Sequence, residues 1–184
     1  MSATAAAVAS PSESKSVASL ADNDFVLFGL TEQFAQDLNA LNDKWKALQR
    51  EAHPDKFAAE GAAAQRLAMQ WSVRINEGYQ RLKDPLKRAA YLCELRGAAI
   101  DAENNTAMPA AFLMQQIEWR EQADEVTTDA QIEKLLTEVS AARHNLLAQC
   151  GRSLDEMGDP QAASRLVRSL MFIEKFESEL TNRL

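Results

Sequence analysis

Cysteine and glycine are both scarce in this sequence of 184 residues, and their scarcity argues against several kinds of site. The two cysteines, Cys93 and Cys150, stand far apart, and neither belongs to a C-x-x-C pair. A disulfide framework or a metal site built by this chain alone is therefore not indicated, and two reduced, buried thiols are the expected reading. The six glycines form neither a phosphate-binding loop nor a nucleophile elbow, so no cofactor is expected.

Long apolar runs are also missing. No stretch approaches the length that is needed to cross a bilayer, so a membrane is not expected as a partner. The N-terminal sequence MSATAAAVASPSESKSVAS lacks the basic start and the long apolar stretch of a signal peptide. We therefore expect the protein to be cytoplasmic.

Negative charge is unevenly distributed along the chain. Residues 1–99 contain twelve acidic and twelve basic residues, whereas residues 100–184 contain fifteen acidic and eight basic ones, so the second half carries the whole net charge of −7. An acidic half does not attract phosphate backbones, which argues against nucleic acid as a partner. A protein with a basic surface fits this half better.

Helix is expected throughout the chain. Glycine and proline are few, while alanine, leucine, glutamate, glutamine and arginine abound, which favours an all-α fold. Residues 1–22 are rich in alanine and serine and are expected to form a disordered tail. The following segment, DFVLFGL (residues 24–30), supplies a dense apolar patch that a turn at Gly29 closes.

Two long antiparallel helices should follow. Asp37 can cap a first helix that ends before Pro54, and a second helix should run from about residue 59 to residue 83. The packed faces, at spacings of three and four, are Leu38, Leu41, Trp45, Leu48 and Ala52 in the first helix, and Leu67, Trp71, Ile75, Gly78 and Leu82 in the second. A shorter helix at 86–95 completes a unit that spans residues 23–96.

The second half should form a three-helix bundle over residues 109–184. Residues 97–108 are rich in turn formers and serve as the linker. The three helices are expected at about 109–126, 129–150 and 160–183, with Gly151 marking the end of the middle one. Because the connections between them are short, antiparallel packing is favoured.

A tripeptide interrupts the two long helices of the first unit. His53 and Asp55 flank Pro54, whose ring fixes the backbone, so an imidazole and a carboxylate are presented at the tip of a surface loop. The simpler alternative is a helix break with incidental polar residues. The surrounding sequence favours a functional loop over a simple helix break, because a basic ridge precedes the loop and the segment INEGYQRLKDPLKRAAYL (residues 75–92) follows it.

This combination resembles the J-domain of DnaJ-type co-chaperones. Together with FVLFGL, LQREAHPDKFA and FLMQQIEWRE (residues 112–121), it resembles the HscB family, the J-proteins of iron–sulfur cluster assembly. The resemblance runs from about Asp24 to the C-terminus. In this family the His-Pro-Asp loop docks on a DnaK-class chaperone, HscA, and stimulates its ATP hydrolysis. The fold that the resemblance implies is an N-terminal J-domain followed by a C-terminal helical bundle.

The resemblance implies a chaperone-binding set in the first unit. Its members are His53, Pro54 and Asp55, with the bases Lys44, Lys46, Arg50 and Lys56. The bases would meet an acidic chaperone surface, so that the contact would weaken with salt. The alternative for each base is an ordinary solvated helix face. Asp43 and Glu51 make this ridge less basic than in other members of the family.

The first helix of the second half has two apolar faces. At about 100° per residue, one narrow stripe suits the bundle core; it consists of Phe112, Trp119, Ala123 and Val126. The opposite side carries Leu113, Met114 and Ile117, beside Glu118, Glu121 and Glu125. One core cannot bury both faces, so the second face is covered either by the first unit or by a partner.

By the resemblance, this second face would bind IscU, the scaffold on which the cluster is built. The matching residues are Leu113, Met114, Ile117, Glu118, Glu121 and Glu125, with Phe172 from the last helix. Ile117 occupies a position at which this family usually has leucine. Phe172 lies off the packed stripe of its own helix, which favours an exposed ring. The alternative is that Met114 and Ile117 belong to a core between the two units.

These observations predict a non-enzymatic adaptor in iron–sulfur cluster biogenesis. It would hold the scaffold on its acidic bundle and deliver it to the chaperone through its J-domain. One alternative is a J-domain co-chaperone for a different client protein. A second alternative, a Cys–His hydrolase, lacks a motif for the nucleophile and the oxyanion site, and His144 stands in the middle of a predicted helix.

Overall fold

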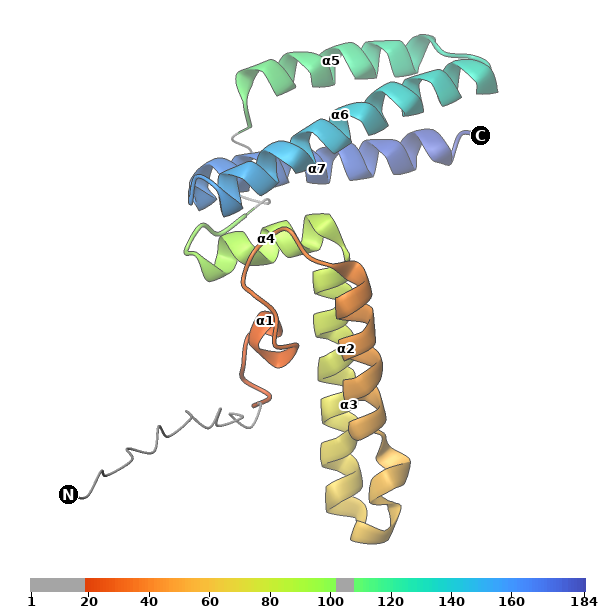
Figure 1. Cartoon of the computed structure of the whole chain (residues 1–184). Helices are drawn as coiled ribbons and strands as arrows, with labels where there is room; N and C mark the ends of the chain where they lie inside the picture. Colours follow the sequence, from red (N-terminus) through yellow and green to blue (C-terminus); the bar gives the residue numbers. More distant parts are fainter. Residues whose placement is uncertain (1–18, 102–107) are drawn as a thin grey trace, which may run out of the picture.

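Every regular element that the computed structural model contains in residues 19–101 and 108–184, the residues that it describes, is a helix (Figure 1). In chain order the elements are α1 (Asp24–Leu27), α2 (Leu38–Glu51), the 3₁₀ helix η1 (Pro54–Glu60), α3 (Ala62–Lys83), α4 (Pro85–Leu95), α5 (Ala110–Glu125), α6 (Asp129–Asp155) and α7 (Pro160–Thr181). The predicted all-α class is thus confirmed. Most of the expected tail (1–18) and half of the expected linker (102–107) lie outside the described residues.

Short polar side chains and prolines set the helix starts. Asp37, Asp84 and Asp159 each cap the helix that follows by accepting hydrogen bonds from its first backbone amides. A proline occupies the first turn of α4 and of α7, where no amide hydrogen is needed. Thr128 forms a capping box with Gln131 at the start of α6. The predicted helix starts at Asp37 and Pro160 are confirmed.

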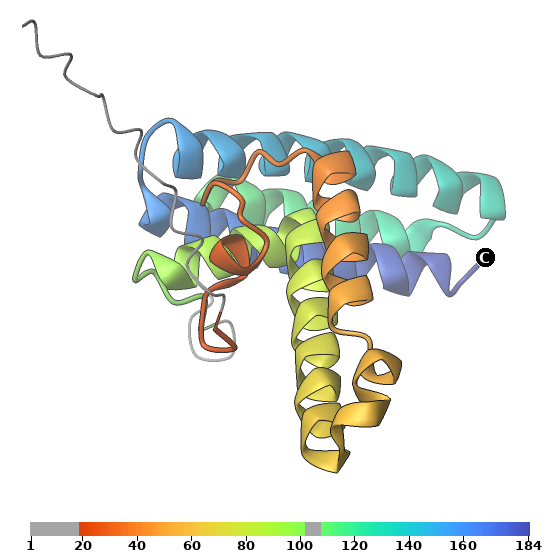
Figure 2. The same ribbon diagram turned by 60° about the horizontal axis from the view of Figure 1, so that its bottom comes forward.

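The molecule consists of a hairpin unit (α1–α4) and a bundle (α5–α7). Helices α2 and α3 run side by side and project away from the bundle, so that the turn between them is the most distant part of the hairpin unit (Figures 1 and 2). Helix α4 lies between the hairpin and the bundle and packs against both α6 and α7. Helix α5 lies on the far side of the bundle (Figure 1).

The hydrophobic core crosses from the hairpin unit into the bundle. Its larger cluster joins Leu92 and Cys93 of α4 to Cys150 and Leu154 of α6 and to Val167 of α7, all of them buried. A smaller cluster fills the other end of the bundle between α5, α6 and α7. Because the larger cluster includes side chains from both units, the two units are packed together rather than joined only by a connecting segment.

The segment between α1 and α2 also binds the bundle. The Asp155 carboxylate, at the end of α6, accepts hydrogen bonds from the backbone amides of Phe34 at 2.7 Å and Ala35 at 2.8 Å. The buried Arg88 of α4 donates from Nε to the carbonyl of Phe34 at 2.8 Å, and its guanidinium lies 5.0 Å from the centre of the Phe34 ring. These contacts fix the segment between the two units.

Gly151 does not end α6, contrary to the prediction from sequence. The helix continues to Asp155, and a Cβ atom at position 151 would lie 2.8 Å from Cδ1 of Phe34. Glycine is present because the Phe34 ring rests on the helix backbone at this point, not because the chain turns. Sequence alone could not show this contact, because the two residues are more than one hundred positions apart.

Replacing Gly151 by alanine is expected to destabilise the protein by about 1 kcal/mol, because displacement of the Phe34 ring outweighs the better helix propensity of alanine. In a Phe34→Ala background the same change should stabilise by roughly 0.5–1 kcal/mol, because only the propensity gain remains. Urea unfolding of the four proteins measures both values. Equal effects of Gly151→Ala in the two backgrounds would contradict this account of the glycine.

The packed face of α3 differs from the prediction at one end. Ile75, Gly78 and Leu82 are buried as expected, but Leu67 is 50% exposed. The reason is that α2 ends at Glu51 and is followed by η1, so the first turns of α3 pack against a 3₁₀ helix. Ala68, which has the smaller side chain, is the residue of this region that is buried.

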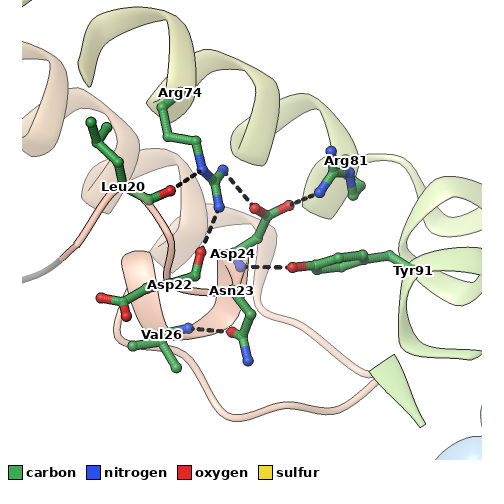
Figure 3. Close-up of polar contacts among 8 residues, drawn as sticks. All are labelled: Leu20, Asp22, Asn23, Asp24, Val26, Arg74, Arg81 and Tyr91. Atoms are coloured by element: carbon green, nitrogen blue, oxygen red, sulfur yellow. Dashed lines mark hydrogen bonds and ion pairs between the residues drawn. The ribbon is translucent and has the colours of Figure 1, made fainter. Parts of the chain in front are cut away.

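Asp24 attaches α1 to α3 and α4 through its buried carboxylate and its backbone amide (Figure 3). Asp24 is fully buried, with Oδ2 accepting a hydrogen bond from Arg81 at 3.0 Å and Oδ1 in an ion-pair contact with Nη1 of Arg74 at 2.7 Å. The backbone amide of Asp24 donates to the hydroxyl of Tyr91 at 3.0 Å. Arg81 also lies over the Tyr91 ring, 4.6 Å from its centre. One residue of α1 is thereby connected to two neighbouring helices, to α3 through its carboxylate and to α4 through its backbone amide.

Residues 19–22 belong to this arrangement, although the sequence predicted a disordered tail up to residue 22. The amide of Asp22 donates to the carbonyl of Ser19, closing a turn. Arg74 donates to the carbonyls of Leu20 at 3.3 Å and Asp22 at 2.8 Å (Figure 3). The prediction failed here because composition cannot reveal an arginine that is more than fifty positions away and binds the backbone.

Candidate partner-binding surfaces

His53, Pro54 and Asp55 form a closed and accessible turn at the tip of the hairpin. His53 caps η1, with Nδ1 accepting from the amide of Asp55 at 3.3 Å and its carbonyl accepting from the amide of Lys56 at 3.0 Å. The side chains of His53 and Asp55 remain 57% and 91% exposed, and Nδ1 lies 3.6 Å from a carboxylate oxygen of Asp55. Backbone hydrogen bonds therefore hold the turn while both functional groups face solvent.

Hydrogen bonds between α2 and α3 lie next to this turn. The hydroxyl of Ser72 donates to the carbonyl of Ala52, the residue before His53, at 3.1 Å. Asn76 Oδ1 accepts from Trp45 Nε1 at 3.0 Å and from Gln49 Nε2 at 2.7 Å. These contacts join α2 and the residue before the turn to α3, so they fix the position of the turn relative to α3.

Basic side chains of the predicted ridge divide between two flanks of α2. Lys46 and Arg50 are exposed on one flank, where Arg50 Nε donates to the carbonyl of Lys46 at 3.3 Å. Lys46 also lies 3.9 Å from Asp43, an exposed pair of little energetic weight. Lys56 is exposed in η1, next to the turn.

Lys44 departs from the prediction. At about 100° per residue it falls on the opposite flank of α2 from Lys46. Its side chain is half-buried and its ammonium donates to the carbonyl of Gly29, the turn after α1. Lys44 thus connects α1 to α2 and lies on a different flank of α2 from Lys46 and Arg50. Its place among the chaperone-binding residues stays a prediction.

Helix α5 shows the two faces that its sequence predicts. Phe112, Trp119 and Ala123 are buried in the smaller core cluster, and Trp119 Nε1 donates to Glu138 of α6 at 2.9 Å. On the outer side Leu113 is 43% exposed, Met114 is 63% exposed and Ile117 is 54% exposed. A core between the two units is therefore not the location of Met114 and Ile117, and that alternative is wrong.

Apolar and acidic residues follow one another along the outer face of α5. Leu113, Met114 and Ile117 occupy the N-terminal half, and the exposed carboxylates of Glu118, Glu121 and Glu125 follow toward the C-terminus. An apolar patch bordered by one sign of charge is typical of a partner-binding surface. Helix α5 and the connection between α2 and α3, which contains η1, lie at opposite ends of the molecule (Figure 1).

Phe172 is not the exposed ring that the sequence predicted. It is half-buried in the smaller core cluster, edge-on to Phe112 with ring centres 5.8 Å apart and stacked with Phe176 at 5.8 Å. Arg120 of α5 lies over it, 5.3 Å from the ring centre. Position relative to its own helix placed Phe172 off the packed stripe, but α5 covers that side. Phe172 therefore borders the outer face of α5 only by its remaining exposed part.

The cysteines and histidines give no support to a hydrolase. Both cysteines are buried and free, as predicted, and burial raises the pKa of Cys93 to about 11 and that of Cys150 to about 12. Both thiols are therefore protonated at neutral pH and poor nucleophiles. Within residues 19–101 and 108–184, no group of three or more histidine, cysteine, aspartate or glutamate side chains is arranged to hold a metal ion. No helix in those ranges is both long and apolar enough to span a bilayer.

Sequence relatives cover nearly the whole chain. Residues 108–181 match the family described as "HSCB C-terminal oligomerisation domain". The "Co-chaperone protein HscB homolog" of Paraburkholderia xenovorans is 48% identical over 171 residues, which are 91% of this chain and 97% of the relative. The protein of the same name from Burkholderia multivorans is 50% identical over 165 residues, covering 88% and 94% of the two chains.

Solved structures show the same architecture of J-domain and C-terminal helical bundle. "Chaperone HscB from Vibrio cholerae" superimposes with a TM-score of 0.74 at 36% identity, over 88% of this chain and 96% of that one. The human co-chaperone protein HscB gives a TM-score of 0.82 over 89% and 82% of the chains, and at 23% identity it shows the fold alone. With relatives near half identity over nine-tenths of its length, this chain belongs to the HscB family of co-chaperones.

Proposed function

We propose that this co-chaperone serves iron–sulfur cluster biogenesis in the cytoplasm, binding the scaffold IscU through its bundle and the DnaK-class chaperone HscA through its J-domain. In this proposal the J-domain spans residues 23–96 and the scaffold-binding bundle residues 109–184. The observation that carries the proposal is that one chain, whose two units share a hydrophobic core, has exposed side chains on α5 and beside η1. These two elements lie at opposite ends of the molecule (Figure 1). The protein itself catalyses no reaction; it stimulates ATP hydrolysis by the chaperone.

The geometry of the hairpin tip supports the chaperone contact. The His53 imidazole is exposed and accepts the backbone amide of Asp55, which lowers the entropic cost of binding the imidazole in one orientation. Lys46, Arg50 and Lys56 lie exposed along α2 and η1 and are suited to an acidic surface. Charges of this kind mainly raise the rate of encounter, so the association should weaken as salt is added.

The outer face of α5 supports the scaffold contact. Three apolar side chains, each more than 40% exposed, form its centre, and three carboxylates extend it on one side. The bundle half of the chain holds the whole excess negative charge, so the partner surface should be apolar with a basic margin. Met114 and Ile117 would be desolvated on binding. The glutamates farther along α5 would raise the rate of encounter with a basic partner.

Replacing Leu113 and Met114 together by alanine should weaken scaffold binding by about 2–4 kcal/mol, because each is expected to contribute 1–2 kcal/mol as an anchor. Calorimetric titration with IscU measures the affinity. The melting temperature should change little, because both side chains are largely exposed. Leu67→Ala, an equally exposed leucine in the hairpin unit, is the matched control and should bind IscU as the unsubstituted chain does.

Unchanged affinity in the double variant would remove α5 from the scaffold contact. Because the matching family is described as an oligomerisation domain, sedimentation of the chain alone is the companion measurement. If the double variant converted a dimer to a monomer and bound IscU normally, the face would be an interface between copies. If the unsubstituted chain stimulated HscA but did not bind IscU, the co-chaperone would serve a different client.

A further inference from the structure

A cavity of about 360 Å³ lies at the end of the bundle where α6 is followed by α7. Helix α6 contributes Gln149, Arg152 and Ser153 to its lining, and α7 contributes Arg165 and Leu166. Residues three and four positions apart share one side of a helix, so each helix presents one set of side chains to the cavity. Its size is within the range of pockets that hold small molecules. None of the residues of the two candidate partner-binding surfaces lines it.

Two arginines meet at this cavity without a partner of opposite charge. Arg152 and Arg165 stand on consecutive antiparallel helices, and no hydrogen bond or ion pair with a described residue engages either guanidinium. Other arginines of the bundle do have partners: Arg143 lies 3.8 Å from a carboxylate oxygen of Glu177, and Arg183 donates to two backbone carbonyls. Two cations that line one cavity repel each other, and an anion bound between them would remove that repulsion.

The carboxylates at this end of the bundle do not supply such an anion. Asp155 accepts the backbone amides of Phe34 and Ala35, and Asp159 caps α7. Glu156 is exposed, and none of these three acidic residues lines the cavity. The negative charge that the two arginines lack must therefore come from a ligand.

A third polar group at the cavity also lacks a partner. Ser153 is 3% exposed, and its hydroxyl makes no hydrogen bond with any residue that the structure describes. The buried serines of α7 differ, because Ser164 and Ser169 each donate to a carbonyl of their own helix, at 2.9 Å and 3.3 Å. Buried hydroxyl groups are nearly always hydrogen-bonded, so an unpartnered one beside a cavity indicates a polar ligand atom.

Apolar side chains form another part of the lining. Leu166 is buried and belongs to the core cluster that joins the hairpin unit to the bundle. Met157, between α6 and α7, is 63% exposed. Pro109 also lines the cavity, because α5 begins at the same end of the bundle (Figure 1). The lining thus combines hydrogen-bond donors with apolar surface, which suits an organic molecule that carries one anionic group.

We infer that this cavity binds the phosphate group of a small phosphate ester. A carboxylate has two oxygens in one plane, and a single guanidinium can satisfy both. Here two guanidinium groups, a hydroxyl and the amide of Gln149 approach from two helices, and this number of donors suits the three terminal oxygens of a phosphate. The apolar lining would contact the organic part of the ester. The inference does not depend on the proposed function, because no residue of either partner-binding surface takes part.

Amide nuclear magnetic resonance of the full chain, titrated with phenyl phosphate, tests this inference. Inorganic phosphate and benzoate are the comparison ligands, because one lacks the apolar part and the other lacks the phosphate. The principal variant carries both Arg152→Gln and Arg165→Gln. Its matched control carries Lys134→Gln and Lys175→Gln, which remove the same charge from exposed positions elsewhere on the bundle. Ser153→Ala tests the hydroxyl alone.

Phenyl phosphate should saturate one site and shift the amide signals of residues 149–153 and 162–166. Its affinity should exceed that of inorganic phosphate and that of benzoate, each by about fivefold or more. The double arginine variant should bind phenyl phosphate about tenfold more weakly, whereas the double lysine variant stays within about twofold. Ser153→Ala should weaken binding by about threefold, as expected for one hydrogen bond.

Shifts that grow without saturation would overturn the inference, and so would equal losses in the two double variants, since phosphate would then bind basic side chains in general. Benzoate or inorganic phosphate binding as tightly as phenyl phosphate would overturn the assignment to a phosphate ester. The amide spectrum without ligand shows whether each variant is folded. If the double arginine variant does not fold, Arg152→Gln and Arg165→Gln are compared singly, and each should lose about threefold; full affinity in both would contradict the inference.

Discussion

Replacing His53 by glutamine is expected to abolish stimulation of HscA ATP hydrolysis and to leave binding of IscU unchanged. The imidazole is exposed at the hairpin tip, and its Nδ1 accepts the amide of Asp55 that starts η1. Glutamine has three rotatable side-chain bonds and no ring, so it cannot hold its polar atoms in the same place. Steady-state ATPase assays with saturating co-chaperone measure the loss.

His144→Gln is the matched control for this experiment. His144 is the other histidine of the chain, exposed on α6 with Nδ1 2.7 Å from the carbonyl of Ser140, and its replacement should leave stimulation unchanged. Both variants should melt within a few degrees of the unsubstituted chain, because substitutions at exposed positions rarely alter stability by more than about 0.5 kcal/mol. Undiminished stimulation by His53→Gln would remove the assigned role of the turn.

The largest loss of stability is expected for Asp24→Ala. This change removes the carboxylate that contacts both Arg74 and Arg81 (Figure 3), and it leaves the partly covered Arg74 without that ion pair. Removing one partner of a buried ion pair typically costs 3–5 kcal/mol, and the partial exposure of both arginines places the expected value near the lower end, about 3 kcal/mol. Urea unfolding followed by circular dichroism measures it.

Asp22→Ala serves as the control for the buried carboxylate. Asp22 lies two residues away, and its side chain accepts a hydrogen bond from the amide of Ser19 at 2.7 Å. Its replacement should cost less than about 1 kcal/mol, as expected for one hydrogen bond near the surface. Equal losses for the two variants would contradict the view that Asp24 attaches α1 to the hairpin.

Features that depend on neighbouring residues could be predicted from the sequence. Asp37 and Pro160 mark helix starts by local capping rules, and His53-Pro54-Asp55 marks a turn because proline excludes helix from the residue before it. The two faces of α5 follow from spacing alone, because residues three and four apart share a side of a helix. Burial of Trp119 and exposure of Met114 confirm that reading.

Features that depend on distant residues could not be predicted in this way. Gly151 is explained by Phe34, and the order of residues 19–22 by Arg74, in each case across more than fifty positions. Phe172 was expected to be exposed because only its own helix was considered, whereas α5 covers it. Lys44 is different, because the helical angle alone places it on another flank of α2 from Lys46, which the sequence could have shown.

The central claim, that one chain presents a bound scaffold to the chaperone whose ATPase it triggers, is tested most directly by HscA turnover at limiting co-chaperone, with and without IscU. We expect the scaffold to raise turnover well above the level reached with the co-chaperone alone. The variant with both Leu113→Ala and Met114→Ala should match the unsubstituted chain without scaffold and lose most of the scaffold-dependent increase. An equal increase for both proteins, or no stimulation by the unsubstituted chain, would contradict the claim.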